Sequence, residues 1–163
     1  MIILKAYKFR LKATPEQAGQ FSQIAGACRV VWNVCLRQRV DAYANFRKSL
    51  NSYSQIPEVT SLRKEYDWIG SVPSQVLQQK VRDLDTAYKN FFEHRADFPE
   101  RKKTGKAADS FRFPQGFRID NRRVFLPKIG WVGFFKSQDI AGTPRNVTVS
   151  RKGKHWFVSI CCE

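Results

Sequence analysis

The 163-residue sequence contains no apolar run close to the roughly 18 residues that a membrane-spanning helix requires. Its start, Met1 to Lys5, also lacks the basic region, apolar stretch and small-residue cleavage site of a secretory signal peptide. These absences argue against insertion into a membrane and against secretion. We therefore expect a protein that works in the cytoplasm and has no membrane partner.

Histidine and cysteine are too few and too widely spaced to indicate a metal site. The two histidines, His94 and His155, lie far apart in the sequence, and the four cysteines include no Cys-x-x-Cys pair. Cys28 and Cys35 are about two turns apart on one face of a predicted helix, and the other two cysteines are adjacent. We expect reduced thiols, no bound metal and no cofactor in this chain.

Acidic residues are scarce, and nothing in their spacing gathers them into a catalytic site. Asp83 and Asp85 are separated by two positions on a predicted helix, so their carboxylates should point apart. A metal-dependent nuclease needs two or three carboxylates on one ion or ion pair. The sequence also lacks a phosphate-binding glycine loop and a nucleophile elbow. We expect no intrinsic catalytic site and rank a metal nuclease that uses these aspartates last.

Positive charge is abundant and is spread along the whole chain. The sequence has 29 Lys and Arg against 14 Asp and Glu, a formal net charge of +15. Residues 1–96 hold 15 basic and 8 acidic groups, and residues 97–163 hold 14 and 6. Such an excess on a folded domain points to a polyanionic partner, because Lys and Arg that neutralise phosphates release counterions. A basic surface kept for solubility is the alternative.

Residues 3–12 alternate in a way that predicts a strand with one apolar and one basic face. The basic parity carries Lys8, Arg10 and Lys12. The apolar parity carries Ile3, Tyr7, Phe9 and Leu11. The three cations either protect the edge of a sheet against aggregation or contact phosphates, and the pattern leaves both open.

Helices are predicted between residues 14 and 94. Thr14-Pro15-Glu16-Gln17 is typical of a capped helix start, and the helix should run to about Lys48. A loop over 51–54 and a short helix over 59–65 follow, and Pro73 opens another long helix. The core-facing positions predicted for the first helix are Phe21, Ala25, Cys28, Trp32, Cys35, Tyr43 and Phe46.

After a basic linker over 95–110, the hydrophobic period changes to that of strands. The flanks of Arg151-Lys152-Gly153-Lys154 predict a hairpin with Gly153 in its turn. The pattern alone therefore predicts an α+β fold: a first strand, a helical insert and a small antiparallel β module. The expected strands are 110–113, 117–119, 122–126, 131–135, 146–150 and 156–160.

Several segments, in order along the chain, resemble the transposon-encoded OrfB/TnpB family. They are Lys5-Ala6-Tyr7-Lys8-Phe9-Arg10-Leu11, Thr14-Pro15-Glu16-Gln17, Cys28-Arg29-Val30-Val31-Trp32-Asn33, Val72-Pro73-Ser74-Gln75-Val76-Leu77-Gln78-Gln79, Tyr88-Lys89-Asn90-Phe91-Phe92, Asp109-Ser110-Phe111-Arg112-Phe113, Leu126-Pro127-Lys128-Ile129-Gly130 and Asn146-Val147-Thr148-Val149-Ser150. The resemblance covers nearly all of residues 5–162. It identifies the chain as similar to the N-terminal half of these proteins.

The resemblance implies an RNA-guided DNA endonuclease related to type V CRISPR effectors, in a bacterium or archaeon. It implies a wedge-like β-barrel (1–12 and 97–163) interrupted by a recognition-like helical domain (13–96). This half would bind the guide RNA scaffold, the start of the heteroduplex and a short transposon-adjacent motif of the target DNA. By motif position, the candidates for contacts to the DNA motif are Tyr53, Ser74, Gln78 and Gln115. The candidates for phosphate contacts are Lys8, Arg10, Lys12, Arg29, Arg82, Arg112, Arg122, Arg123 and Arg151.

The sequence departs from the family at its end. In the family, a RuvC-type nuclease domain that binds Mg and Zn follows the wedge, whereas this sequence stops at Glu163. We therefore expect a truncated product or an N-terminal fragment that does not cleave DNA. The alternative is a stand-alone, sequence-specific DNA-binding regulator that uses the helical insert like a helix-turn-helix.

Overall fold

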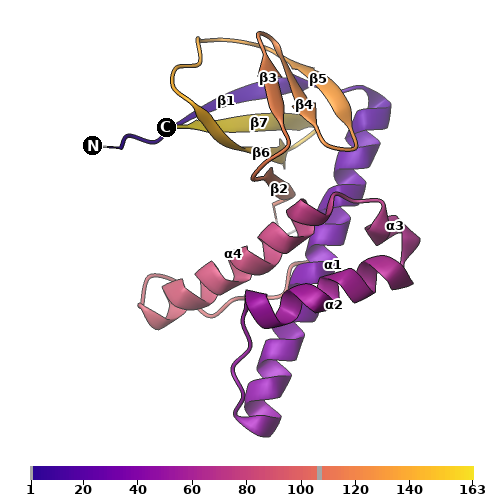
Figure 1. The fold of residues 1–163 in the computed structure, drawn as a ribbon, viewed down its shortest axis with the longest axis vertical. Coiled ribbons are helices and arrows are strands. Elements are labelled where there is room, and N and C mark those ends of the chain that lie inside the picture. The colour runs from indigo at the N-terminus through magenta and orange to yellow at the C-terminus, as the bar shows by residue number, and fades with distance from the viewer. Residues whose placement is uncertain (1, 106–107) are drawn as a thin grey trace. The chain divides into compact units, whose positions relative to one another are not determined.

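The computed structural model describes residues 2–105 and 108–163, and the chain forms two compact units. The sheet unit joins the first 25 residues to residues 108–163, and the helical unit consists of residues 26–107. Helix α1 (Pro15–Phe46) supplies its first turns to the sheet unit and the remainder to the helical unit (Figure 1). The sheet unit is therefore discontinuous in sequence, with the helical unit inserted within it.

The sheet unit is built on an antiparallel sheet of seven strands in the described residues. In spatial order the strands are β2 (Ser110–Phe113), β6 (Pro144–Lys152), β7 (His155–Cys162), β1 (Lys5–Lys12), β5 (Gly130–Phe134), β4 (Arg123–Leu126) and β3 (Arg118–Asp120). The tight turn between β6 and β7 contains Gly153, whose φ is 62°. The predicted hairpin and the α+β class with a helical insert are confirmed.

The sheet is open, so the barrel that the resemblance implied is not closed. Among the described residues, β2 and β3 are the two edge strands, although they follow each other in the sequence. Pro114 comes directly after β2 and has no N–H to extend a ladder, and Gly116 turns the chain with a φ of 79°. These two residues end β2 before it can pair with β3.

The inner face of the sheet forms the hydrophobic core of the sheet unit. Along β1, buried and exposed side chains alternate as the sequence predicted, but the strand starts at Lys5 and the predicted apolar Ile3 is exposed. Phe9 stacks on Phe134 with ring centroids 4.9 Å apart, and Phe21 of α1 lies 5.3 Å from the ring of Trp156. Each such buried ring stabilises the fold by about 1.5–3 kcal/mol. The opposite face of the sheet therefore carries the polar and charged side chains.

A capping box starts helix α1, as the sequence predicted. The Thr14 N–H donates to Gln17 Oε1 and the Gln17 N–H donates to Thr14 Oγ1, each at 3.1 Å. Gln17 Nε2 also donates to the carbonyl of Trp131 on β5. This second bond ties the start of the helix to the sheet.

The helical unit also contains α2 (Ser52–Glu65), α3 (Asp67–Gly70) and α4 (Ser74–Phe92). The loop predicted over residues 51–54 was wrong, because Asn51 caps α2 and exchanges side-chain and backbone hydrogen bonds with Ser54. This capping box starts α2 seven residues before the predicted Val59. No helix in residues 2–105 and 108–163 has the length and apolar character needed to cross a membrane.

The buried stripe of α1 ends at Arg39, earlier than predicted. Phe21 to Cys35 are buried at the expected spacing, but Tyr43 and Phe46 are exposed. That part of the prediction was wrong, because the buried contacts from α2 reach α1 at Cys35 and Arg39. Beyond that point the aromatic side chains of α1 are accessible to solvent.

The segment after α4 has no regular structure, yet hydrogen bonds hold it against α1. Trp32 Nε1 donates to the carbonyl of Glu100 at 2.9 Å, and Asn33 forms two hydrogen bonds with the backbone of Lys102. Burial lowers the pKa of the Lys102 ammonium, which lies 4.5 Å from the centre of the Trp32 ring. The predicted linker is thus fixed at residues 100–102, and Lys106 lies outside the described residues.

Candidate nucleic-acid interface

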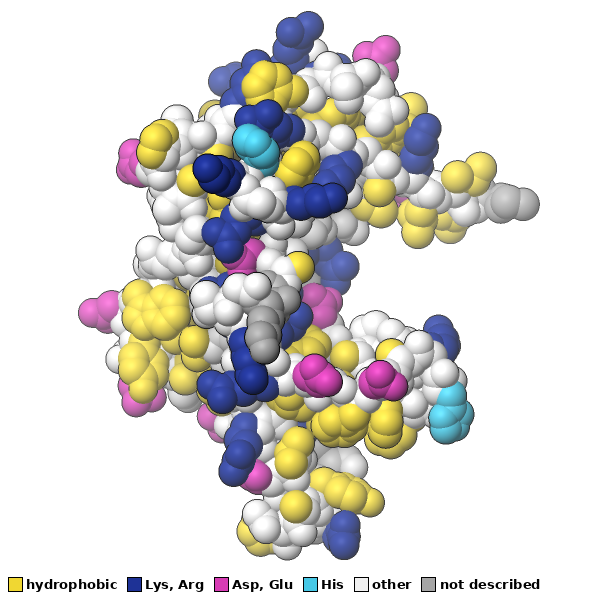
Figure 2. All heavy atoms as spheres, turned by 180° about the vertical axis from the view of Figure 1, so that it is seen from behind, with side chains coloured by type: hydrophobic (Ala, Val, Ile, Leu, Met, Phe, Trp, Pro, Cys, Tyr) yellow, Lys and Arg dark blue, Asp and Glu magenta, His cyan; other side chains and the backbone are white. Residues whose placement is uncertain are grey.

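The outer face of the sheet carries cations and aromatic rings on six of its strands. We call this surface the basic sheet face. Figure 2 shows Lys and Arg side chains spread over the sheet unit with hydrophobic side chains between them. Its residues, placed by strand pairing and exposure, are Lys8, Arg10, Lys12, Arg112, Arg118 and Arg123, with Phe125, Trp131, Phe135 and Phe157.

The register of the strands aligns one row of polar side chains across this face. Arg112 on β2 pairs with Thr148 on β6, Thr148 pairs with Ser159 on β7, and Ser159 pairs with Lys8 on β1. Side chains at paired positions are neighbours on the same face of a sheet. The row therefore places a cation at each end and two hydroxyl groups between them, all of which can bond phosphate or ribose oxygens.

Most cations of the basic sheet face lie over aromatic rings. Lys8 Nζ is 5.0 Å from the centre of the Phe157 ring, and Lys12 Nζ is 4.7 Å from that of Phe135. Arg10 also lies over Phe135, with its Cζ 5.6 Å from the ring centre. A ring orients a cation without cancelling its charge. Phosphates can therefore still approach these groups.

Sequence reasoning missed the aromatic half of this surface. The rings of Trp131 and Phe135 are 37% and 52% exposed, and Arg123 and Arg118 extend over Trp131 and Phe125 at 4.2 and 5.8 Å. In the strand expected over residues 131–135, Trp131 shares its parity with Phe135, and Val132 shares its parity with Phe134. This two-residue alternation is the signal that could have placed Trp131 and Phe135 together on one face. Exposed rings beside cations can stack on bases while the cations hold the backbone.

The remaining arginine candidates and Gln115 differ in their surroundings. Arg151 forms an ion pair with Asp109, a buried carboxylate, at 2.5 Å, so it links β6 to the chain just before β2. Arg123 bonds Asp120 at 3.0 Å on the neighbouring strand. Arg122 and Gln115 are exposed in the connections of the sheet unit. The ion pair between Arg151 and Asp109 would therefore have to break before Arg151 could contact a phosphate.

In the helical unit, three candidates share one face of α4. Ser74, Gln78 and Arg82 are four residues apart and form a column that starts at the first residue of the helix. Pro73 precedes the helix and gives no side-chain cap to its first N–H groups. Tyr53 is 90% exposed on the first turn of α2, and Arg29 is half-buried on α1. The structure thus groups three of these five residues on one helix.

The aspartates of α4 have structural roles. Asp85 accepts hydrogen bonds from buried Arg39 at 2.5 Å and from the N–H of Ser52 at 3.0 Å, so it joins α1, α2 and α4. Asp83 accepts from Gln79 at 3.0 Å. In the part of the chain that the structure describes, no group of three His, Cys, Asp or Glu side chains is placed to hold a metal ion.

The cysteines are buried thiols, apart from the half-buried Cys161. Burial raises the pKa of Cys28 from its ordinary value of 9.0 to about 11, and it raises the pKa of Cys35 by the same amount. Burial also raises the pKa of Cys162. Because the thiolate is the reactive form, these groups resist oxidation and metal binding near neutral pH.

We expect the free energy of unfolding to fall as the pH rises from about 9 to about 11. The folded protein holds the protons of Cys28 and Cys35 more tightly than the unfolded chain does, so this stability is complete below pH 9.0 and is lost toward pH 11. Each thiol contributes on the order of 2 kcal/mol. Urea unfolding across this pH range should show a smaller fall in the free energy of unfolding for the Cys28→Ala, Cys35→Ala double variant. An equal fall would show that the two thiols do not cause the pH dependence.

One family match covers the start of the chain. Residues 1–48 match HTH_OrfB_IS605, described as a helix-turn-helix domain. In the structure these residues form strand β1 and the continuous helix α1. The matched segment therefore presents one strand and one helix, and the other helices follow it.

Three curated proteins are similar to the chain. InsQ of Escherichia coli (strain K12), named as a candidate RNA-guided DNA endonuclease, is 39% identical over 98% of this chain. A Streptomyces pristinaespiralis protein with the same description is 30% identical over 99%. The virulence protein VsdF of Salmonella dublin is 32% identical over 64% of this chain and 98% of its own length. The chain spans only 40% and 42% of the lengths of the first two relatives.

Proposed function

The chain belongs to the transposon-encoded OrfB/TnpB family, and we propose that it is the nucleic-acid-binding N-terminal part of an RNA-guided DNA endonuclease. In this proposal it binds the guide RNA scaffold, the first part of the guide–target heteroduplex and a short DNA motif beside the target. Base pairing would then carry most of the sequence specificity. The proposal assigns no cleavage step and no metal to these residues.

The main observation in support of this proposal is the basic sheet face. Its row of Arg112, Thr148, Ser159 and Lys8 presents cations and hydroxyl groups in one line across four strands. Exposed aromatic rings lie beside the cations of the neighbouring strands. Phosphate contacts supply most of the affinity of nucleic-acid-binding proteins, and stacked rings accept unpaired bases. We propose that the sheet unit is the wedge-like part and holds RNA.

The α4 column supports a role of the helical unit in reading DNA. Ser74 and Gln78 offer hydrogen-bonding groups one turn apart, and Arg82 follows on the same face. Side chains of these types can reach base edges from the start of a helix, where the helix dipole also favours a phosphate. We propose that Ser74 and Gln78, with Tyr53 and Gln115, contact the transposon-adjacent motif, and that Arg82 contacts a phosphate.

Binding to three labelled ligands tests the proposed function. The ligands are a guide scaffold RNA of a family member, a scrambled RNA of equal length and composition, and duplex DNA. We expect the purified protein to prefer the first RNA, with an affinity that falls linearly with salt on logarithmic axes. Equal affinity for the scrambled RNA at physiological salt would overturn the proposal.

The stand-alone regulator is the second candidate, and the description of the 1–48 match favours it. A helix-turn-helix regulator should select one duplex DNA sequence in the absence of RNA, as a dimer on a two-fold site. The same experiment separates the two functions, because the RNA-guided role gives weak, unselective binding to duplex DNA alone. A sedimentation measurement with the selected duplex would reveal the dimer.

A further inference from the structure

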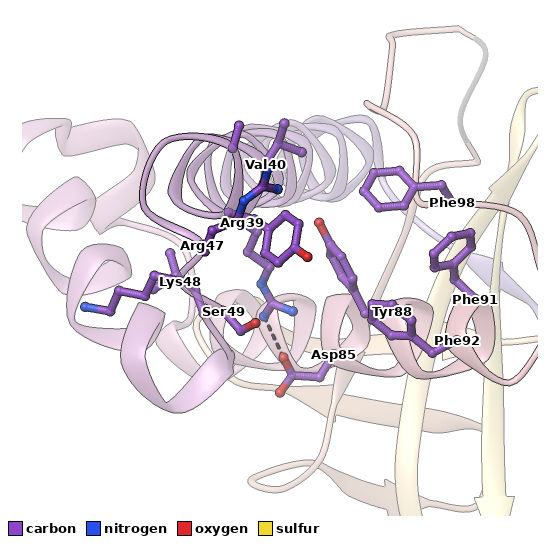
Figure 3. Close-up of a pocket in the computed structure, with 13 residues that line it drawn as sticks. Arg39, Val40, Arg47, Lys48, Ser49, Asp85, Tyr88, Phe91, Phe92 and Phe98 are labelled. Carbon is purple, nitrogen blue, oxygen red and sulfur yellow. Dashed lines mark hydrogen bonds and ion pairs between the residues drawn. The ribbon is translucent and has the colours of Figure 1, made fainter.

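A groove of about 710 Å³ opens in the helical unit between the ends of α1 and α4. We call it the aromatic groove, after the five rings that line it: Tyr43, Tyr88, Phe91, Phe92 and Phe98. In Figure 3 the rings of Tyr88, Phe91 and Phe92 rise from α4, and that of Phe98 comes from the segment that follows. Neither the basic sheet face nor the α4 column includes any of these residues.

Three of the five rings are exposed, and the four that do not belong to α1 pack against one another. Tyr43, Phe92 and Phe98 are 55%, 69% and 43% exposed. The ring centre of Phe98 lies 5.3 Å from that of Tyr88 and 5.2 Å from that of Phe91, each pair edge to face. These contacts brace the walls of the groove, so a flat ligand would meet rings already in place. A preformed site of this kind reduces the entropy lost on binding.

The charges at the groove are positive. It is lined by Arg39, Arg47 and Lys48, and the one carboxylate in its lining, Asp85, already accepts a hydrogen bond from Arg39. Arg47 ends α1 in a left-handed conformation with a φ of 52°, and its guanidinium lies 5.2 Å from the ring of Tyr43. The net charge therefore favours an anionic ligand and disfavours a basic peptide.

We propose that the aromatic groove binds an unpaired nucleotide of an RNA strand. The base would stack on the rings of Tyr43 and Phe92, and its phosphate would lie near Arg47 and Lys48. Aromatic rings flanked by cations are the groups that hold single-stranded nucleic acids without base pairing. This inference rests on the proposed function and adds to it a second, separate contact region on the helical unit.

Substitutions of exposed rings test the inference without disturbing the core. Tyr43→Leu and Phe92→Leu keep an apolar side chain but remove the ring, whereas Phe92→Tyr keeps it. Phe46→Leu is the matched control, because Phe46 is exposed on α1, the helix that carries Tyr43, and is absent from the lining of the groove. The probe is a short single-stranded RNA that contains 2-aminopurine, whose fluorescence is quenched when the base stacks on an aromatic ring.

We expect the wild-type protein, Phe92→Tyr and Phe46→Leu to quench the probe and bind it equally. Tyr43→Leu and Phe92→Leu should lose the part of the quenching that the groove supplies, and binding at the groove should weaken about fivefold to a hundredfold, the range for one stacked base. Unchanged RNA binding by both leucine variants would overturn the groove site alone. It would fit a groove that takes an apolar peptide instead, because leucine keeps the lining of the groove apolar. A wild-type protein that ignores the RNA would overturn the proposed function as well.

Discussion

Replacing Lys8, Arg10 and Lys12 together with glutamine should weaken RNA binding by about fiftyfold at physiological salt. Each phosphate contact to a single strand adds about 0.7 to the slope of log affinity against log salt, so three contacts account for a slope of about 2. The three side chains are exposed on β1 and lie over rings of the basic sheet face. A salt titration of the triple variant should show both the lower affinity and the shallower slope.

A second triple variant controls for the loss of net charge. Lys64→Gln, Lys128→Gln and Lys154→Gln remove the same number of charges from exposed positions outside the basic sheet face. If the basic sheet face binds RNA, this variant should keep most of its affinity, because only long-range attraction is reduced. Equal losses in the two variants would show that binding depends on net charge alone and would contradict the assigned surface.

Asp85→Ala should destabilise the helical unit by about 3 kcal/mol, near the lower end of the range for breaking a buried ion pair. The change leaves the Arg39 guanidinium, whose side chain is 5% exposed, without its carboxylate partner. It also removes the acceptor of the Ser52 N–H at the start of α2. Urea unfolding followed by circular dichroism should show the midpoint move to a lower urea concentration.

Two further variants make this result specific. Asp41→Ala removes a carboxylate of α1 whose ion-pair partner, Arg37, is exposed, so its cost should stay below about 1 kcal/mol. Adding Arg39→Met to Asp85→Ala should recover part of the lost stability, because no unpaired charge then stays buried. A similar loss for Asp41→Ala and Asp85→Ala would contradict the structural role of Asp85.

Local patterns in the sequence were enough for most of the secondary structure. The alternation along β1, the capping residues Thr14 and Gln17 and the Gly153 turn each act over a few residues, so the sequence alone predicts them. Strand register is different, because it depends on which strands meet in space. The row from Arg112 to Lys8 joins residues more than 100 positions apart, and no local pattern encodes it.

The helical unit shows where reasoning from single residues is wrong. An arginine on a helix is usually solvated, and no pattern in the sequence indicates that Arg39 would be buried between Gln55 and Asp85. Tyr43 and Phe46 continue the apolar period of α1, yet they are exposed. Periodicity identifies the face of a helix but not how far along that face a partner extends. The aromatic groove lies past the point on α1 where the buried contacts from α2 end.

The insertion of the helical unit after β1 also determines which part of the chain can fold first on the ribosome. Strand β1 pairs only with β5 and β7 in the described residues, so it must wait until more than 100 further residues have been made. The helical unit depends on contacts between closer segments, and such low contact order favours rapid folding. The first strand would thus remain unpaired while residues 26–107 fold, and its apolar side would need protection from aggregation during synthesis.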